Sequence, residues 1–213
     1  MKSRAIRLTV VAVVAMLVVP TVAGAKTARS VYRAKGAWSA SVRHSGLCLE
    51  KLTCPGVSNS QHGYFLSTEV GSLTGVGATS TATFTSRAFK YRGAAGRRAG
   101  NLVLSLGRHS ATKSFLSVAG NSARYTVDVV GARSGATVAE PIRNAPLTNT
   151  DSWTRVSKRI VPASSLQVGR GYRVTITSTF RNGADVIPGA TADYRKVKLV
   201  ARKHVRKHHR RHH

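Results

Sequence analysis

Residues 172–181 alternate between apolar and polar side chains with a period of two. One parity is apolar except for Ser178, and the other carries only arginine and threonine: Tyr172, Val174, Ile176 and Phe180 against Arg173, Thr175, Thr177, Thr179 and Arg181. This pattern predicts an antiparallel β-strand with one dry face and one wet face. Turn-forming residues stand on both sides of it, at 162–171, 182–183 and 188–189. We therefore expect the chain to double back through strands joined by turns.

Other segments carry the same signal and are separated by Gly, Asn and Ser clusters. They are 38–43, 64–70, 78–91, 102–106, 114–118 and 124–130, with two more that begin at Trp153 and at Ala192. The apolar parity changes between Phe84 and Phe89, which predicts a β-bulge that lets both halves face the core. No stretch shows a sustained 3.6-residue period. We predict one all-β domain over residues 61–200, an antiparallel β-sandwich.

The first 25 residues form the pattern of a secretory signal peptide. Three cations (Lys2, Arg4 and Arg7) precede an apolar run at 8–19, and Ala23-Gly24-Ala25 has the small-x-small form of a cleavage site. The run is shorter than the roughly 20 residues that span a bilayer as a helix, so a retained anchor is the less favoured reading. We expect the mature chain to be secreted or associated with the cell envelope.

Residues 26–60 are predicted to form a basic leader followed by a disulfide loop. The chain has two cysteines, Cys48 and Cys54, and an exported chain meets an oxidising compartment. The spacing is wrong for a Cys-x-x-Cys redox site. We therefore expect a Cys48–Cys54 disulfide that shapes a surface loop.

The chain is strongly basic, with 34 Lys and Arg residues against 7 Asp and Glu residues, a net charge of +27. Such a charge favours an anionic partner, although a solvated cationic surface explains it equally well. Because a signal peptide argues against nucleic acid, we expect a polysaccharide or another anionic envelope polymer, or peripheral electrostatic contact with a membrane. The His-, Arg- and Lys-rich tail at 201–213 is predicted to be disordered and to contact polyanions rather than a specific metal ion.

The order of motifs in the last 90 residues resembles the galactose-binding-like jelly rolls of carbohydrate-binding modules. The motifs are Trp153, Ile160-Val161-Pro162, Leu166, Gly169, the strand 172–176 and the closing segment 193–199. This resemblance implies a jelly-roll β-sandwich of eight or nine strands that is often non-enzymatic and binds carbohydrate. Arg195 and Lys196 stand where many of these modules carry an acidic residue near a structural calcium. This departure argues against a calcium site.

Motifs of catalysis are missing. The sequence has no Gly-x-Ser-x-Gly elbow, no phosphate-binding loop and no His-Glu-x-x-His. The carboxylates outside the leader are scattered along the chain; Asp128 is expected to pair with an arginine across the sheet, and His109 to be an isolated surface histidine. We predict no catalytic residue, no metal site and no cofactor. A secreted polysaccharide hydrolase with a dispersed active site is the alternative.

Binding is then the expected activity. We predict Tyr91, Arg92, Arg97, Arg98 and Arg173 as ligand-binding residues, because planar guanidinium groups grip carboxylates or phosphates through two bonds. A merely soluble arginine-rich surface explains the arginines equally well. Trp153 and Phe180 are assigned to the core.

Overall fold

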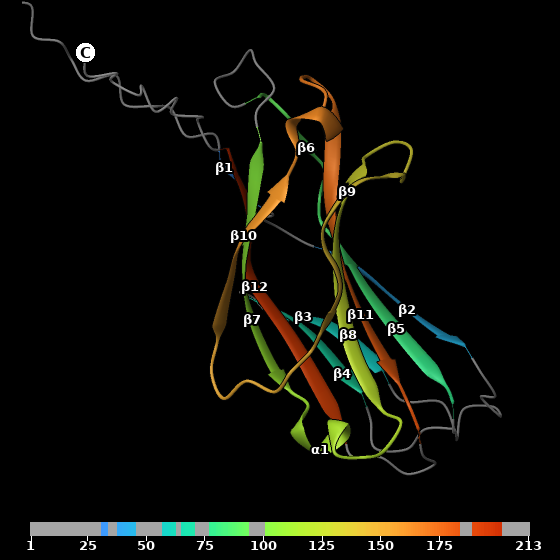
Figure 1. Ribbon diagram of the computed structural model, residues 1–213. Helices are drawn as coiled ribbons and strands as arrows, with labels where there is room; N and C mark the ends of the chain where they lie inside the picture. The colour runs from blue at the N-terminus through green and yellow to red at the C-terminus, as the bar shows by residue number, and fades with distance from the viewer. Residues whose placement is uncertain are drawn as a thin grey trace, which may run out of the picture.

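The computed structural model describes residues 31–33, 38–45, 57–62, 65–70, 77–93, 101–183 and 189–201. The predicted signal peptide, the two cysteines, Arg97, Arg98 and residues 202–213 lie outside these ranges. The described chain forms two antiparallel sheets packed face to face (Figure 1). Its helical segments are all too short to cross a membrane.

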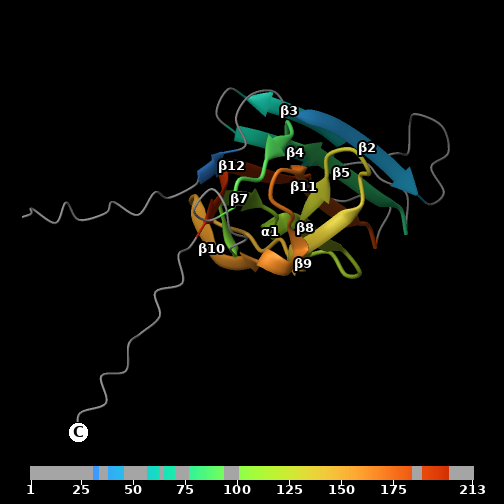
Figure 2. The ribbon, with the colours of Figure 1, turned by 90° about the horizontal axis from the view of Figure 1, so that it is seen from above.

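We call the two layers sheet A and sheet B, and Figure 2 shows them from above. Sheet A has the order β10 (Thr154–Val161), β7 (Leu102–Ala111), β12 (Ala190–Ala201), β4 (Phe65–Val70) and β3 (Val57–His62), and β1 (Val31–Arg33) also pairs with β12. Sheet B has the order β2 (Ser39–Ser45), β5 (Thr79–Thr85), β11 (Gly171–Arg181), β8 (Ser122–Gly131) and β9 (Thr137–Pro146), and β6 (Phe89–Lys90) also pairs with β11.

The connectivity is that of a jelly roll. The order β4-β12-β7-β10 in sheet A is matched by β5-β11-β8-β9 in sheet B. Between β4 and β12, each step along these eight strands crosses from one sheet to the other, except the hairpin of β8 and β9. This is the arrangement of two interlocked Greek keys. The predicted fold class, a single antiparallel jelly-roll β-sandwich, is therefore confirmed.

The core is filled by the apolar parity of the strands. Phe180 is fully buried, as predicted, and its ring meets Phe115 edge-on with centroids 5.8 Å apart. Ser178, the polar interruption in the apolar parity, is also buried, and its hydroxyl oxygen lies 2.9 Å from that of Tyr194. The interruption is thus tolerated because the buried hydroxyl has a partner in the opposite sheet.

The predicted bulge is confirmed where β5 gives way to β6. Phe84 pairs with Ile176 and Phe89 pairs with Tyr172, so five residue steps on one side oppose four on β11. The extra residue changes the parity that faces the core. It also leaves Ser86 buried, where its hydroxyl accepts a hydrogen bond from the Val174 backbone N–H at 2.9 Å.

The structure corrects three expectations about secondary structure. The segment 114–118 is not a strand, because it contains a single helical turn, α1 (Lys113–Leu116), that buries Phe115. A second short turn, η1 (Ala163–Ser165), follows β10. β9 was missed because it lacks clean alternation: it contains Pro141, has register shifts against β8, and holds Asn144 at a φ of 45°. β1 and most of β3 lie within residues 26–60, the range expected to be leader and loop.

Candidate functional site

The outer face of sheet B is a grid of hydroxyl and arginine side chains, which we call the hydroxyl–arginine face. Strands β2, β5, β11 and β8 stand side by side in unbroken register there. From one end to the other, its rows are Ser39–Thr85–Thr175–Asp128, Ser41–Thr83–Thr177–Thr126, Arg43–Thr81–Thr179–Arg124 and Ser45–Thr79–Arg181–Ser122. The polar parity predicted from residues 172–181 is therefore one column of a larger surface.

Neighbouring side chains in the grid hold one another in place. The hydroxyl oxygens of Thr83 and Thr177 are 3.2 Å apart, and Thr126 Oγ1 accepts a hydrogen bond from the Asn144 backbone N–H at 3.0 Å. Strands lie about 4.8 Å apart and alternate residues of one strand about 6.6 Å apart, which fixes the spacing of the hydroxyl groups. The face thus presents donors and acceptors in a regular, preorganised array.

A hollow of about 370 Å³ opens at one end of this grid, lined by Ser39, Thr85, Ser86, Arg87, Ala88 and Arg173. Arg87 is exposed and Arg173 is half-buried. The Nε atom of Arg173 is buried and has no hydrogen-bond partner among the described residues. A buried N–H of a cationic group without an acceptor is costly, which makes this hollow a natural place for an anion.

Asp128 is the carboxylate in this grid. Burial raises its pKa from 3.8 to about 6, and the neighbouring Glu140 carboxylate contributes to the same shift. Glu140 itself lies 3.4 Å from the Nε of Arg143. The expectation that Asp128 pairs with an arginine across the sheet is wrong, because its opposite neighbour is Thr175 and the nearby charge is another carboxylate.

The structure separates the five residues predicted to bind a ligand. Tyr91 is fully buried against the rings of Tyr32 and Tyr172, so the prediction that it faces a ligand is wrong. Arg92 is exposed, and its backbone N–H donates to the Tyr32 hydroxyl at 2.7 Å. Arg173 lies in the hollow. Arg97 and Arg98 fall outside the described residues.

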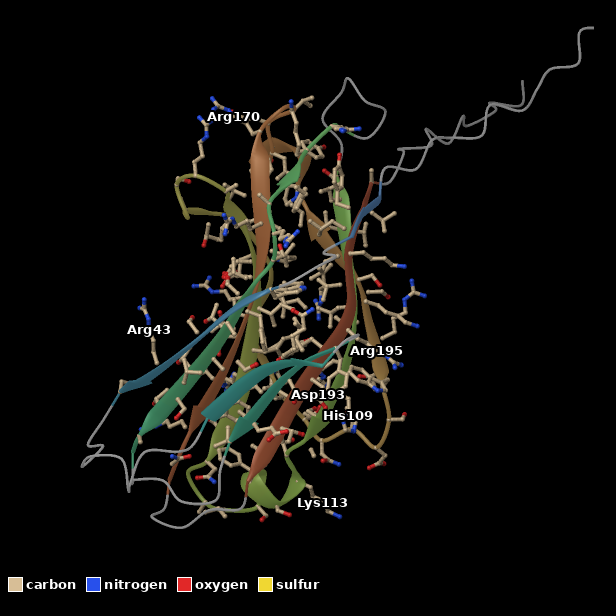
Figure 3. The ribbon with its side chains drawn as sticks, turned by 180° about the vertical axis from the view of Figure 1, so that it is seen from behind. Arg43, His109, Lys113, Arg170, Asp193 and Arg195 are labelled. Atoms are coloured by element: carbon tan, nitrogen blue, oxygen red, sulfur yellow. The ribbon has the colours of Figure 1, made fainter. Side chains whose placement is uncertain are left out.

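A second group of side chains lies on the outer face of sheet A. We call it the Trp153 cluster; it comprises Phe65, Ser67, His109, Trp153, Asp193 and Arg195. Trp153 is only half-buried, so its assignment to the core is wrong. The Arg195 guanidinium lies over its indole, 4.1 Å from the ring centroid, and Phe65 meets the indole edge-on at 6.0 Å. Figure 3 shows Arg195, His109 and Asp193 on the side of the sandwich opposite Arg43.

Side chains from three strands form a chain of hydrogen bonds in this cluster. His109 Nδ1 donates to Asp193 Oδ2 at 3.0 Å, and Ser67 Oγ donates to Asp193 Oδ1 at 2.6 Å. His109 is therefore not the isolated histidine that we expected. The order of contacts is Ser–Asp–His, so no imidazole stands beside the serine hydroxyl to act as its base, and the geometry does not suit nucleophilic catalysis.

The sequence hides this cluster because its members are far apart along the chain. Register brings them together: Asp193 pairs with Ser67 on one side and with His109 on the other. Alternation in the sequence places residues 193 and 195 on the same face of their strand, but it does not show which strands pair with that strand. Within the described ranges, no group of three or more His, Cys, Asp or Glu residues could hold a metal ion.

Comparisons with known proteins return only distant structural similarities. No family model and no curated protein matches it. Similar solved structures include a glycoside hydrolase domain, Endo-D, from Streptococcus pneumoniae R6 (11% identity, TM-score 0.41, 78% of this chain and 22% of that chain). They also include a family 11 carbohydrate-binding module from Clostridium thermocellum (10%, TM-score 0.32, 84% and 92%) and CBM27-1 from Caldicellulosiruptor saccharolyticus (12%, TM-score 0.37, 73% and 88%).

The chain thus spans about a fifth of the length of the hydrolase domain. The features of the molecule that bear on function are the two outer faces of the sandwich.

Proposed function

We propose that this protein is a secreted, non-enzymatic binding module for an acidic envelope glycan or a similar anionic polymer, and that the hydroxyl–arginine face is its binding surface. The observation that carries the proposal is Arg173. Its Nε lies buried in the hollow without a hydrogen-bond partner among the described residues, and the exposed Arg87 lines the same hollow. An anionic group seated between the two would satisfy both.

The rest of the face suits a polymer rather than a single small anion. Beyond the hollow, two rows consist almost entirely of hydroxyl residues, and Arg43, Arg124 and Arg181 follow in the next two rows. Arg173 and Arg181 are eight residues apart on β11, roughly 26 Å at about 3.3 Å per residue. A glycan chain lying along the strands would meet cations at both ends of the grid and hydroxyl groups between them.

Charge and targeting favour the same ligand class. The net charge of +27 raises the local concentration of polyanions around the whole molecule. The signal-peptide pattern of residues 1–25 supports export, which favours polymers of the envelope over nucleic acid. Tyr91 is not part of this proposal, because it is buried.

The test is the double substitution Arg87→Gln and Arg173→Gln, measured as affinity for a glycerol-phosphate teichoic acid, for polygalacturonate and for neutral dextran. Loss of charge-assisted hydrogen bonds should weaken binding of the acidic polymers by about tenfold to a hundredfold. Arg170→Gln is the single-charge control, because Arg170 is exposed and, among the described residues, its Nε is bonded to Gln167 within its own turn. It should change affinity by no more than about twofold.

A loss of binding free energy in the double variant that is only about twice the loss in the control would reduce the effect to net charge and contradict a defined site, because the double variant removes two charges and the control removes one. Unchanged affinity of the double variant for the acidic polymers would show that the hollow does not bind them. Tight binding of dextran would contradict the anionic class.

A second candidate function, hydrolysis of polysaccharide, is favoured by one observation. Asp128 has a pKa near 6 beside Glu140, whose carboxylate is paired with Arg143. Two carboxyl groups with different environments are the pattern of a glycosidase acid and its partner. If this reading holds, wild type should release reducing ends from polygalacturonate or another bound polymer, and Asp128→Asn should abolish that release. If the protein is a binding module, neither wild type nor Asp128→Asn releases reducing ends.

A further inference from the structure

We infer that the Trp153 cluster is a second ligand site, built for a uronic acid residue, that is, a sugar ring that bears a carboxylate. It lies on the outer face of sheet A, whereas the hydroxyl–arginine face lies on sheet B. The two sites share no residue. A ligand could therefore occupy the Trp153 cluster whether or not the hydroxyl–arginine face binds a polymer.

Arg195 is laid out across the sheet by its neighbours. It pairs in register with Gly107 on β7, and its side chain crosses that glycine to reach the indole of Trp153. A Cβ atom at residue 107 would lie 3.0 Å from Arg195 Cγ and 3.6 Å from Trp153 Cε3. Glycine at this position therefore makes room for the stack.

Stacking leaves the N–H edges of the guanidinium available. Neither of the two ion pairs among the described residues involves Arg195. A planar guanidinium held flat against an aromatic ring is preorganised to donate two parallel hydrogen bonds to one carboxylate. An ion pair formed there would lie beside the indole rather than in open solvent, which strengthens it.

His109 supplies the complementary group. Because Nδ1 donates to Asp193, the Nε2 atom of the neutral ring is an acceptor, and the ring centroid lies 5.7 Å from that of Trp153. Asp193 is itself fixed by Ser67, whose side chain is buried. The hydrogen bonds from Ser67 to Asp193 and from His109 to Asp193 thus orient the imidazole, and the His109 side chain is still 30% exposed.

These groups together define the ligand. Arg195 covers one face of the Trp153 indole, so the apolar surface assigned to the C–H face of a sugar ring is the rest of the indole with the Phe65 ring at its edge. Arg195 offers paired donors to a carboxylate, and His109 offers an acceptor to a hydroxyl. A neutral sugar would leave the Arg195 donors unused, and a bare anion would leave the aromatic surface unused. A uronic acid uses all three.

Trp153 also provides the readout. The chain has two tryptophans, so Trp38→Phe leaves the Trp153 indole as the single source of tryptophan emission. In that background, titration with trigalacturonate should shift or quench the emission, and galactotriose should bind at least about tenfold more weakly, as expected for the loss of a charge-assisted pair. Arg195→Lys keeps the charge but loses the planar fork, and should weaken trigalacturonate binding by a similar factor.

Lys198→Gln is the control, because Lys198 lies on the same strand and outside the cluster; it should leave the titration within about twofold. Arg87→Gln with Arg173→Gln should also leave it unchanged, which separates this site from the one on sheet B. An emission that does not respond to trigalacturonate contradicts the site. Equal affinity for the neutral trisaccharide, or full affinity in Arg195→Lys, contradicts the assignment to a uronic acid.

Discussion

The two outer faces of the sandwich are built by different means. The hydroxyl–arginine face is regular: four strands in unbroken register repeat Ser, Thr and Arg at every second position, with Asp128 as the exception. The Trp153 cluster is irregular: its members come from β4, β7, β12 and the residue just before β10, and β12 shifts its register against β7 between Arg195 and Lys198. One face therefore suits an extended polymer, and the other suits a single residue of defined chemistry.

This difference teaches how a strand pattern can and cannot specify a site. Alternation decides which side chains leave the core, and it does so within each strand separately. Which exposed side chains meet depends on the pairing of strands, and a shift of register changes every contact. A repetitive face keeps its chemistry after such a shift, because another Thr or Ser takes the place of each displaced side chain. A cluster of unlike residues does not, because the shift separates the side chains that must meet.

The largest expected effect is on stability, and it tests whether Trp153 lies on an outer face rather than in the core. Phe180→Ala should lower the free energy of unfolding by about 3–5 kcal/mol, because Phe180 is fully buried against Phe115. Trp153→Ala should cost only about 1 kcal/mol, because it removes one cation–π contact and a half-buried ring. Urea unfolding of both variants measures the difference.

Equal losses in the two variants would return Trp153 to the core, where the sequence had placed it. The carbohydrate site proposed at its cluster would then lose its main support. A smaller loss for Trp153→Ala sharpens the contrast between core and face.

The sequence predicted the fold, and it predicted the polar face of the strand at 172–181, which is part of the hydroxyl–arginine face. Alternation at 172–181 predicted the inward Phe180 and the outward Arg173 correctly, and the change of parity after Phe84 located a real bulge. It failed for Tyr91, which follows a two-residue strand and turns inward against Tyr32. Polar neighbours made Tyr91 look exposed, because the aromatic partner that covers it lies about 60 residues away.

A middle-sized effect tests the geometry of the irregular face alone. Gly107→Ala places a Cβ 3.0 Å from Arg195 Cγ, so the Arg195 side chain must shift by a few tenths of an ångström and its stack on the indole is disturbed. We expect a loss of about 1–2 kcal/mol in the free energy of unfolding, together with a change of Trp153 emission in the Trp38→Phe background. In an Arg195→Ala background the same substitution should cost much less, because the crowded side chain is gone. Equal costs in both backgrounds would show that Gly107 serves the backbone instead.

The smallest effect belongs to the regular face and concerns its carboxylate. Burial and Glu140 raise the pKa of Asp128 from 3.8 to about 6, so the folded state holds a proton that the unfolded state has already released between these values. Stability contributed by this group therefore falls as pH rises from about 4 to about 6, and stays reduced above that range.

Asp128→Asn replaces the carboxyl group by a neutral amide of the same shape and removes this penalty. The variant should melt a few degrees above wild type at pH 7.5 and at the same temperature as wild type at pH 4, with Asp151→Asn, a substitution in an exposed turn, as the charge-matched control. Glu140→Gln should recover part of the gain at pH 7.5, because it removes the like charge. A variant that is less stable than wild type at pH 7.5 would mean that ionised Asp128 has a stabilising partner after all. The grid would then contain a structural ion pair where the present geometry places two carboxylates side by side.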